Sequence, residues 1–267
     1  MSPGVFVRLS PENSDYLSQD KLVGVFVKGL GDRDRHHAGF VFAYEEADPQ
    51  SGASIFQETR QLDFIDDNRI VFGKFKPGGQ WLHATIDFAT AQSRTAFAAY
   101  LTAVALMHAE GSNILYGMTW QGLAKCFDDQ GVYTPQDIDG LTCATFMCEI
   151  VGLQFDYPVD FDSWPFAEDQ DIAWAQAKLH KLREKAMSQD SAMTMERVDA
   201  MESRKDWKRL RPAQAAAAIA KGDGKWQMAH VDANALAEQV IADFYAAFPP
   251  PPSKPAATPT PTPAPAP

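Results

Sequence analysis

A cysteine opens an apolar helix in the stretch Gly140-Leu141-Thr142-Cys143-Ala144-Thr145-Phe146-Met147-Cys148-Glu149-Ile150-Val151. The pattern predicts a helix from Thr142 to Val151, with Thr142 as the N-cap and Gly152 as the stop. Cys143 then lies in the first turn, where unpaired N–H groups and the helix dipole favour a thiolate. The same N–H groups suit the oxyanion that forms when a thiolate attacks a carbonyl group.

The chain has three cysteines, Cys126, Cys143 and Cys148, an odd and sparse set that does not indicate a disulfide framework. Cys143 and Cys148 lie five residues apart in one helix and therefore point in different directions. We expect Cys148 to be a small buried apolar side chain. Cys126 falls in a loop with no helix end or histidine beside it in the sequence. Cys143 is thus the candidate nucleophile, and burial as a small hydrophobe is its alternative role.

A histidine precedes a strand in the stretch His36-His37-Ala38-Gly39-Phe40-Val41-Phe42. Strand alternation places His37 on one face with Gly39 and Val41, and the bulky Phe40 and Phe42 on the other, which we expect to face the core. His37 would then lie on the face with small residues, where a cleft can form. Thiolate plus imidazole is the minimum for a cysteine hydrolase, so the two segments are expected to meet.

The rest of the chain predicts an α+β fold, with a small antiparallel sheet packed on helices. Strands are expected at 22–27, 38–44, 70–75 and 79–88, with a connection over 45–79. Helices are expected at 90–110, at 171–211 with the apolar stripe Ile172, Ala175, Leu179 and Leu182, and at 233–248.

Changes in composition predict three parts. Residues 1–165 would form the domain that holds the sheet and Cys143, and residues 166–248 a helical C-terminal extension. Residues 249–267 are Pro, Thr and Ala with little else, which predicts a disordered tail.

Composition excludes several classes of function. The 267 residues are 45% hydrophobic and carry a formal charge of −11, which argues against nucleic acid as a partner. No CxxC pair or HExxH motif is present, so we expect neither a metal nor a cofactor. The N-terminus lacks the pattern of a Sec signal, and no apolar run is long enough to span a bilayer. We expect a cytoplasmic protein, with non-classical export as the alternative.

The arrangement resembles the papain-like enzymes in which the histidine precedes the cysteine in the chain. These are circularly permuted relatives of the NlpC-type cell-wall peptidases, grouped with the lecithin:retinol acyltransferase-like and PPPDE-type proteins. Their strand motif His-x-Gly-Φ-x-Φ, where Φ is apolar, reads His37-Ala38-Gly39-Phe40-Val41-Phe42 here. Their helix motif Cys-x-x-Phe-Val reads Cys143-Ala144-Thr145-Phe146-Met147, with Met in place of Val. The resemblance covers about Leu22 to Leu153, and the helical region after Asp171 has no counterpart.

The resemblance implies a catalytic triad. Cys143 would be the nucleophile and His37 the general base, while His83, on a following strand, would be the third polar residue that fixes the imidazole. The Cys143 N–H would form part of the oxyanion hole, and Tyr116 and Thr142 would line the oxyanion or substrate site.

The implied reaction is acyl transfer to water, with a peptide, a peptidoglycan fragment or another acyl compound as substrate. The alternative is a non-catalytic interaction or adaptor protein built on the same scaffold, which would bind a protein partner through its C-terminal helices.

Overall fold

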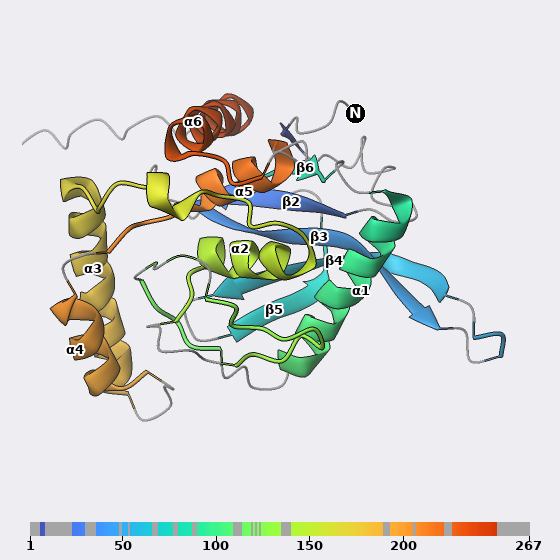
Figure 1. Cartoon of the computed structure of the whole chain (residues 1–267), viewed down its shortest axis with the longest axis horizontal. Coiled ribbons are helices and arrows are strands. Elements are labelled where there is room, and N and C mark those ends of the chain that lie inside the picture. Colours follow the sequence, from blue (N-terminus) through green and yellow to red (C-terminus); the bar gives the residue numbers. More distant parts are fainter. Residues whose placement is uncertain are drawn as a thin grey trace, which may run out of the picture.

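The computed structural model describes most of the chain (Figure 1). It covers residues 6–8, 23–29, 36–47, 50–52, 54–65, 69–76, 80–86, 90–108, 114–118, 120, 122, 124–134, 140–188, 193–204, 207–221 and 226–249. Most of the predicted tail, residues 250–267, lies outside this described part, as do Leu22, Gly79, Asp87 and Phe88 at the ends of predicted strands.

The fold is α+β, as the sequence predicts, and its centre is a six-stranded sheet in which every neighbouring pair is antiparallel. The strand order is β1-β6-β2-β3-β4-β5. The bounds are β1 Val7–Arg8, β2 Val23–Gly29, β3 His36–Ala47, β4 Ser54–Ile65, β5 Arg69–Lys74 and β6 Trp81–Thr85.

Strand β4 was not predicted. It lies within 45–79, which was expected to be a connection, apart from the strand predicted at 70–75. It pairs with β3 from Phe40↔Leu62 to Ala47↔Ser54, and with β5 on its other edge. The apolar residues Leu62 and Phe64 alternate with polar ones and are buried, which is the period-two signal of a strand. That signal covers only the last few residues of a long polar segment, which is why the segment is mistaken for a loop.

Helices α1 (Ala91–His108), α2 (Cys143–Gln154) and α5 (Pro212–Lys221) pack on the sheet (Figure 1). The predicted face assignment of β3 is confirmed: Phe40 and Phe42 belong to the main core, whereas Val41 joins a small separate cluster with Phe26 and Phe75. The main apolar core therefore lies on the face of the sheet that carries Phe40 and Phe42.

The C-terminal region forms three further helices: α3 (Asp169–Ala186), α4 (Met195–Ser203) and α6 (His230–Ala247). The predicted helix over 171–211 is thus two helices, which pack on each other at one end of the molecule (Figure 1). Of the predicted stripe, Ile172 is exposed and the other three residues are buried. One apolar core includes residues from Phe6 to Phe248, so it extends across residue 165, where the sequence predicts a domain boundary.

Helix α2 lies at the centre of the structure, with all residues from Ala144 to Val151 buried. Phe146 stacks on Phe64 of β4, with ring centroids 5.7 Å apart, and meets Phe127 edge to face at 5.8 Å. The buried Glu149 accepts hydrogen bonds from the backbone N–H groups of Ala124 and Cys126 at 2.9 and 3.4 Å. The helix is thus fixed against the sheet on one side and against the preceding loop on another.

We predict that Phe146→Ala lowers the free energy of unfolding by about 3–5 kcal/mol, because it removes a fully buried ring and leaves a cavity. The matched control is Phe166→Ala: Phe166 is 64% exposed, and its truncation is expected to change stability by less than about 0.5 kcal/mol. Urea unfolding followed by circular dichroism measures both. Equal losses in the two variants would contradict the central place of α2.

Candidate active site

The backbone that leads into α2 is held by the segment around Tyr116. Leu141 N–H donates to the Leu115 carbonyl at 2.8 Å, and Gly117 N–H donates to the Leu141 carbonyl at 3.1 Å. Gly140 has a φ of +114°, and a Cβ there would lie 2.4 Å from the Leu115 oxygen, so glycine is required. These contacts fix where the first turn of the helix begins.

Thr142 is the N-cap of α2, as predicted. Its hydroxyl accepts from the Thr145 N–H at 3.2 Å, and the Thr145 hydroxyl accepts from the Thr142 N–H at 2.8 Å, which completes a capping box. Cys143 is therefore the first helical residue, at the end of the helix where the dipole is positive. Thr142 also lines the cleft described below, and its role in holding an oxyanion or substrate stays a prediction.

His37, the second residue of β3, lines the same cleft as Cys143 and lies close enough for the two side chains to interact electrostatically. Burial of the imidazole opposes its charged form, but the negative charge of the Cys143 thiolate and hydrogen bonds with Asp63 and Cys143 outweigh this effect. Together they raise the pKa of His37 to about 9. The two segments thus meet at one cleft, and a negative charge on Cys143 favours the imidazolium form of His37.

Asp63 of β4 is the residue on the other side of the imidazole. Its Oδ2 accepts from Nε2 of His37 at 2.8 Å and from Nζ of Lys28 at 3.0 Å. A carboxylate only accepts, so Nε2 of His37 carries a proton that it donates to Asp63. Burial opposes the charge on Asp63, but the hydrogen bonds and positive charges of His37 and Lys28 hold the pKa of this carboxyl below its usual range.

Position 39, two residues after His37, has no room for a side chain. A Cβ at Gly39 would lie 2.7 Å from the Cβ of Asp63, from the Leu62 carbonyl oxygen and from the Phe26 ring. Any side chain at this position would push the carboxylate away, so Gly39 leaves the space through which Asp63 reaches His37.

The third polar residue is therefore not where the sequence predicts it. His83 lies in β6 and pairs with Phe26 of β2, the strand that separates β6 from β3. It is fully buried, and burial lowers the pKa of His83 to about 4, so the side chain is neutral at physiological pH. The structure places Asp63 in the position given to His83. Asp63 was missed because it lies in the unpredicted strand β4, where only the alternation Leu62-Asp63-Phe64 marks it.

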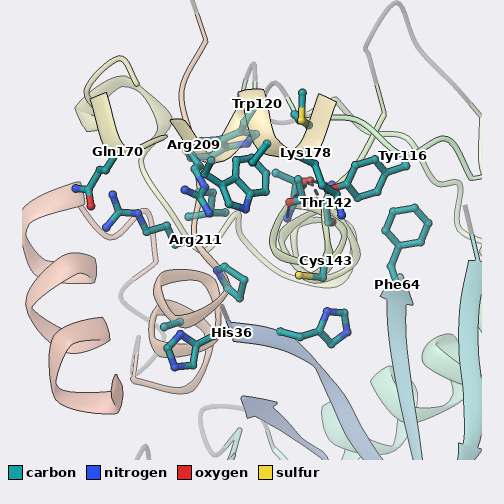
Figure 2. A pocket seen from close by; sticks show the side chains of 18 of the residues that line it. His36, Phe64, Tyr116, Trp120, Thr142, Cys143, Gln170, Lys178, Arg209 and Arg211 are labelled. Carbon is teal, nitrogen blue, oxygen red and sulfur yellow. Dashed lines mark hydrogen bonds between the residues drawn. The ribbon is translucent and has the colours of Figure 1, made fainter. Parts of the chain in front are cut away.

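Cys143 and His37 open into a cleft of about 500 Å³ (Figure 2). Its walls come from α2, from the ends of β3 and β4, from the segment around Tyr116, and from α3, α6 and residues 209–213. The C-terminal helices thus contribute one side of the cleft. Cys143 is partly exposed, as access by a substrate requires.

Tyr116 lines the same cleft and is itself buried. Its ring stacks on Phe64 at 6.2 Å, and Nζ of Lys178 lies 5.1 Å from the ring centroid. Figure 2 shows Tyr116 and Phe64 on the same side of Cys143. The predicted contribution of its hydroxyl to an oxyanion hole stays a prediction.

The two other cysteines are fully buried, as expected for Cys148. Burial and the nearby Glu149 raise the pKa of both Cys126 and Cys148. Their thiols therefore stay protonated and shielded, and Cys143 differs from them in both exposure and partner.

No protein-family model, curated protein or solved structure matches this chain. Within the described residues, no group of three or more His, Cys, Asp or Glu side chains could hold a metal ion. None of the helices in this part of the chain is long and apolar enough to cross a membrane.

We predict that Cys143→Ala lowers the pKa of His37, because it removes the negative charge and the hydrogen bond that raise it. NMR titration of the imidazole protons measures the change, with Cys148→Ala as the control that leaves the value near 9. Because the pKa is raised above 6.5, protonation of His37 stabilises the fold below about pH 6.5, and this stability is lost as the pH rises through about 9. An unchanged His37 pKa in Cys143→Ala would contradict the contact.

Proposed function

We propose that this protein is a cysteine hydrolase that cleaves an amide, peptide, ester or thioester bond with Cys143, His37 and Asp63. The observation that carries the proposal is a thiol at a helix N-terminus that shares one cleft with a buried imidazole, which is itself hydrogen-bonded to a buried carboxylate. A nucleophile, a base and a group that orients the base are the parts that such chemistry needs.

Each step has a residue suited to it. Sγ of Cys143 attacks the substrate carbonyl carbon, and the resulting oxyanion is held by N–H groups of the first turn of α2, that of Cys143 included. The bond to the leaving group then breaks, and the imidazolium of His37 gives its proton to that group. Water attacks the thioester, His37 takes its proton, and the acid leaves as the thiol is restored.

Asp63 and Lys28 support this cycle from behind the imidazole. Asp63 fixes the ring with Nε2 as donor, which sets the orientation of the imidazole. Lys28 donates to the same oxygen of Asp63 and lies 4.8 Å from the centroid of the Trp81 ring, which holds the ammonium in place. We assign both as positioning residues, because neither is placed to touch the substrate.

The arrangement is also what the resemblance to permuted papain-like enzymes implies, with one change of residue. The cysteine opens a buried helix, the histidine opens a strand of the antiparallel sheet, and a polar residue of the next strand orients it. In this proposal that residue is Asp63.

We predict that iodoacetamide labels Cys143 selectively at about pH 6, well below the pKa of about 8.5 of a free thiol. Asp63→Asn is expected to slow this labelling by at least about tenfold, because the base loses its orientation. His83→Leu, in strand β6 of the same sheet, is the matched control and is expected to leave the rate unchanged. Mass spectrometry of peptides gives the site and the rate, and thermal unfolding confirms that each variant is folded. Labelling that needs high pH, or that is equal at all three cysteines, would overturn the proposal.

We predict turnover of an acyl compound that Cys143→Ser reduces by at least about 10³-fold, because a serine hydroxyl is a much weaker nucleophile beside this imidazole. The assay screens peptidoglycan fragments, peptides and acyl esters, and follows products by mass spectrometry. A covalent acyl adduct on Cys143 in the wild type would identify the substrate class. A protein whose Cys143 is unreactive in the labelling experiment, and which turns over none of the three classes, would instead fit the adaptor function.

A further inference from the structure

The cleft is positively charged although the chain as a whole carries −11. Among the described residues that line it there are four Lys or Arg side chains, Lys178, Lys181, Arg209 and Arg211, and no Asp or Glu. An acidic protein that gathers four cations around one opening creates a local field of opposite sign, which concentrates anions there.

The two arginines are held in fixed positions. Both donate to Oδ1 of the buried Asp171, Arg209 at 2.8 Å and Arg211 at 3.1 Å. Arg209 also lies flat against Trp174, with its guanidinium carbon 3.7 Å from the ring centroid. One carboxylate balances only one of the two charges, so this group keeps one excess positive charge at the wall of the cleft.

Helix α3 supplies the other two cations from one face. Trp174, Lys178 and Lys181 recur at helical spacing, and all three line the cleft. The adjacent face of the helix, one residue further on, carries the buried Ala175, Leu179 and Leu182. The orientation of α3 is thus set by core packing, which leaves its cationic face directed to the cleft.

The two arginines and the pair Tyr116 and Phe64 lie on different sides of Cys143. In Figure 2, Arg209 and Arg211 lie on one side of Cys143, while Tyr116 and Phe64 lie on the opposite side. Lys178 lies near Tyr116, in agreement with its position over that ring. A substrate that reaches Cys143 therefore meets cations across much of the opening.

We propose that the cleft selects acyl substrates that carry a carboxylate near the scissile bond, such as acidic peptides, and that Lys178, Lys181, Arg209 and Arg211 form the subsite for that carboxylate. This inference rests on the proposed function, because it assigns the substrate class of the same site. The arginines offer planar donors that match a carboxylate, and the lysines add charge that draws it in.

The test compares two alkylating probes that differ in charge, iodoacetate and iodoacetamide. Each forms a bond from Sγ of Cys143 to its methylene carbon and releases iodide. The ratio of the iodoacetate rate to the iodoacetamide rate is measured for Cys143 and for 2-mercaptoethanol, a neutral free thiol. We expect the ratio for Cys143 to exceed that of the free thiol by at least about threefold, and to fall toward it in about 0.5 M salt.

The double variant Lys178→Gln/Lys181→Gln removes two positive charges and leaves His37 unchanged, so it separates the effect of the lysines on the ratio from that of His37. It is expected to lower the ratio by at least about threefold. Lys76→Gln/Lys221→Gln is the matched control, since it makes the same change in net charge with residues outside the cleft lining, and it is expected to leave both rates unchanged. Thermal unfolding verifies the fold of each variant, and the salt dependence of the wild type tests the inference without any substitution.

The outcomes separate this inference from the proposed function. If iodoacetamide labels Cys143 no faster than it labels the free thiol at about pH 6, the proposed function fails. A second outcome is that Cys143 is reactive, but its ratio of iodoacetate rate to iodoacetamide rate equals that of the free thiol and does not change with salt or in the lysine variant. This outcome overturns the proposed carboxylate subsite and leaves Cys143 as the nucleophile.

Discussion

The burial of α2 is the constraint on which the site depends. A helix that is apolar on every side has no stable position at a surface, so it must be enclosed by the sheet, by α5 and by the loop before it. Only two of its buried residues are polar. Thr145 completes the N-cap, and Glu149 binds backbone N–H groups of the loop at 124–126. Both use their polarity to fix the helix, and as a result Cys143 stands at a defined place over the end of β3.

Pairs of opposite charges hold the side chains around Cys143 in place. Behind Cys143, the charges of His37 and Asp63 are opposite in sign, and Lys28 adds a second positive charge beyond Asp63. Each buried charge has a partner of opposite sign, which offsets much of the cost of removing it from water. Farther out, Asp171 holds the two arginines of the cleft wall in the same way. The C-terminal helices are therefore part of the site and not an addition to it.

The sequence predicts some elements well and others poorly, for physical reasons. The helix of Cys143 and its N-cap are found because cap residues and apolar runs are local signals. Within the region at 171–211, α3 and α4 are helical as predicted. The division between them and the end of α4 at Ser203 are not predicted, and residues 207–211 are not helical. Strand β4 is missed because much of it is polar, so the alternation of buried apolar side chains marks only its last few residues.

The same distinction holds for the site. The sequence by itself determined that a thiol would stand at the start of a buried helix and that His37 would open a strand, because both follow from local patterns of polarity and glycine. Only the tertiary structure decided that Asp63, and not His83, orients the imidazole. Strand order places β4 beside β3, Gly39 clears the space between them, and β2 separates His83 from His37. The cationic wall likewise depends on how α3 packs, since residues that distant in sequence meet only when the core is formed.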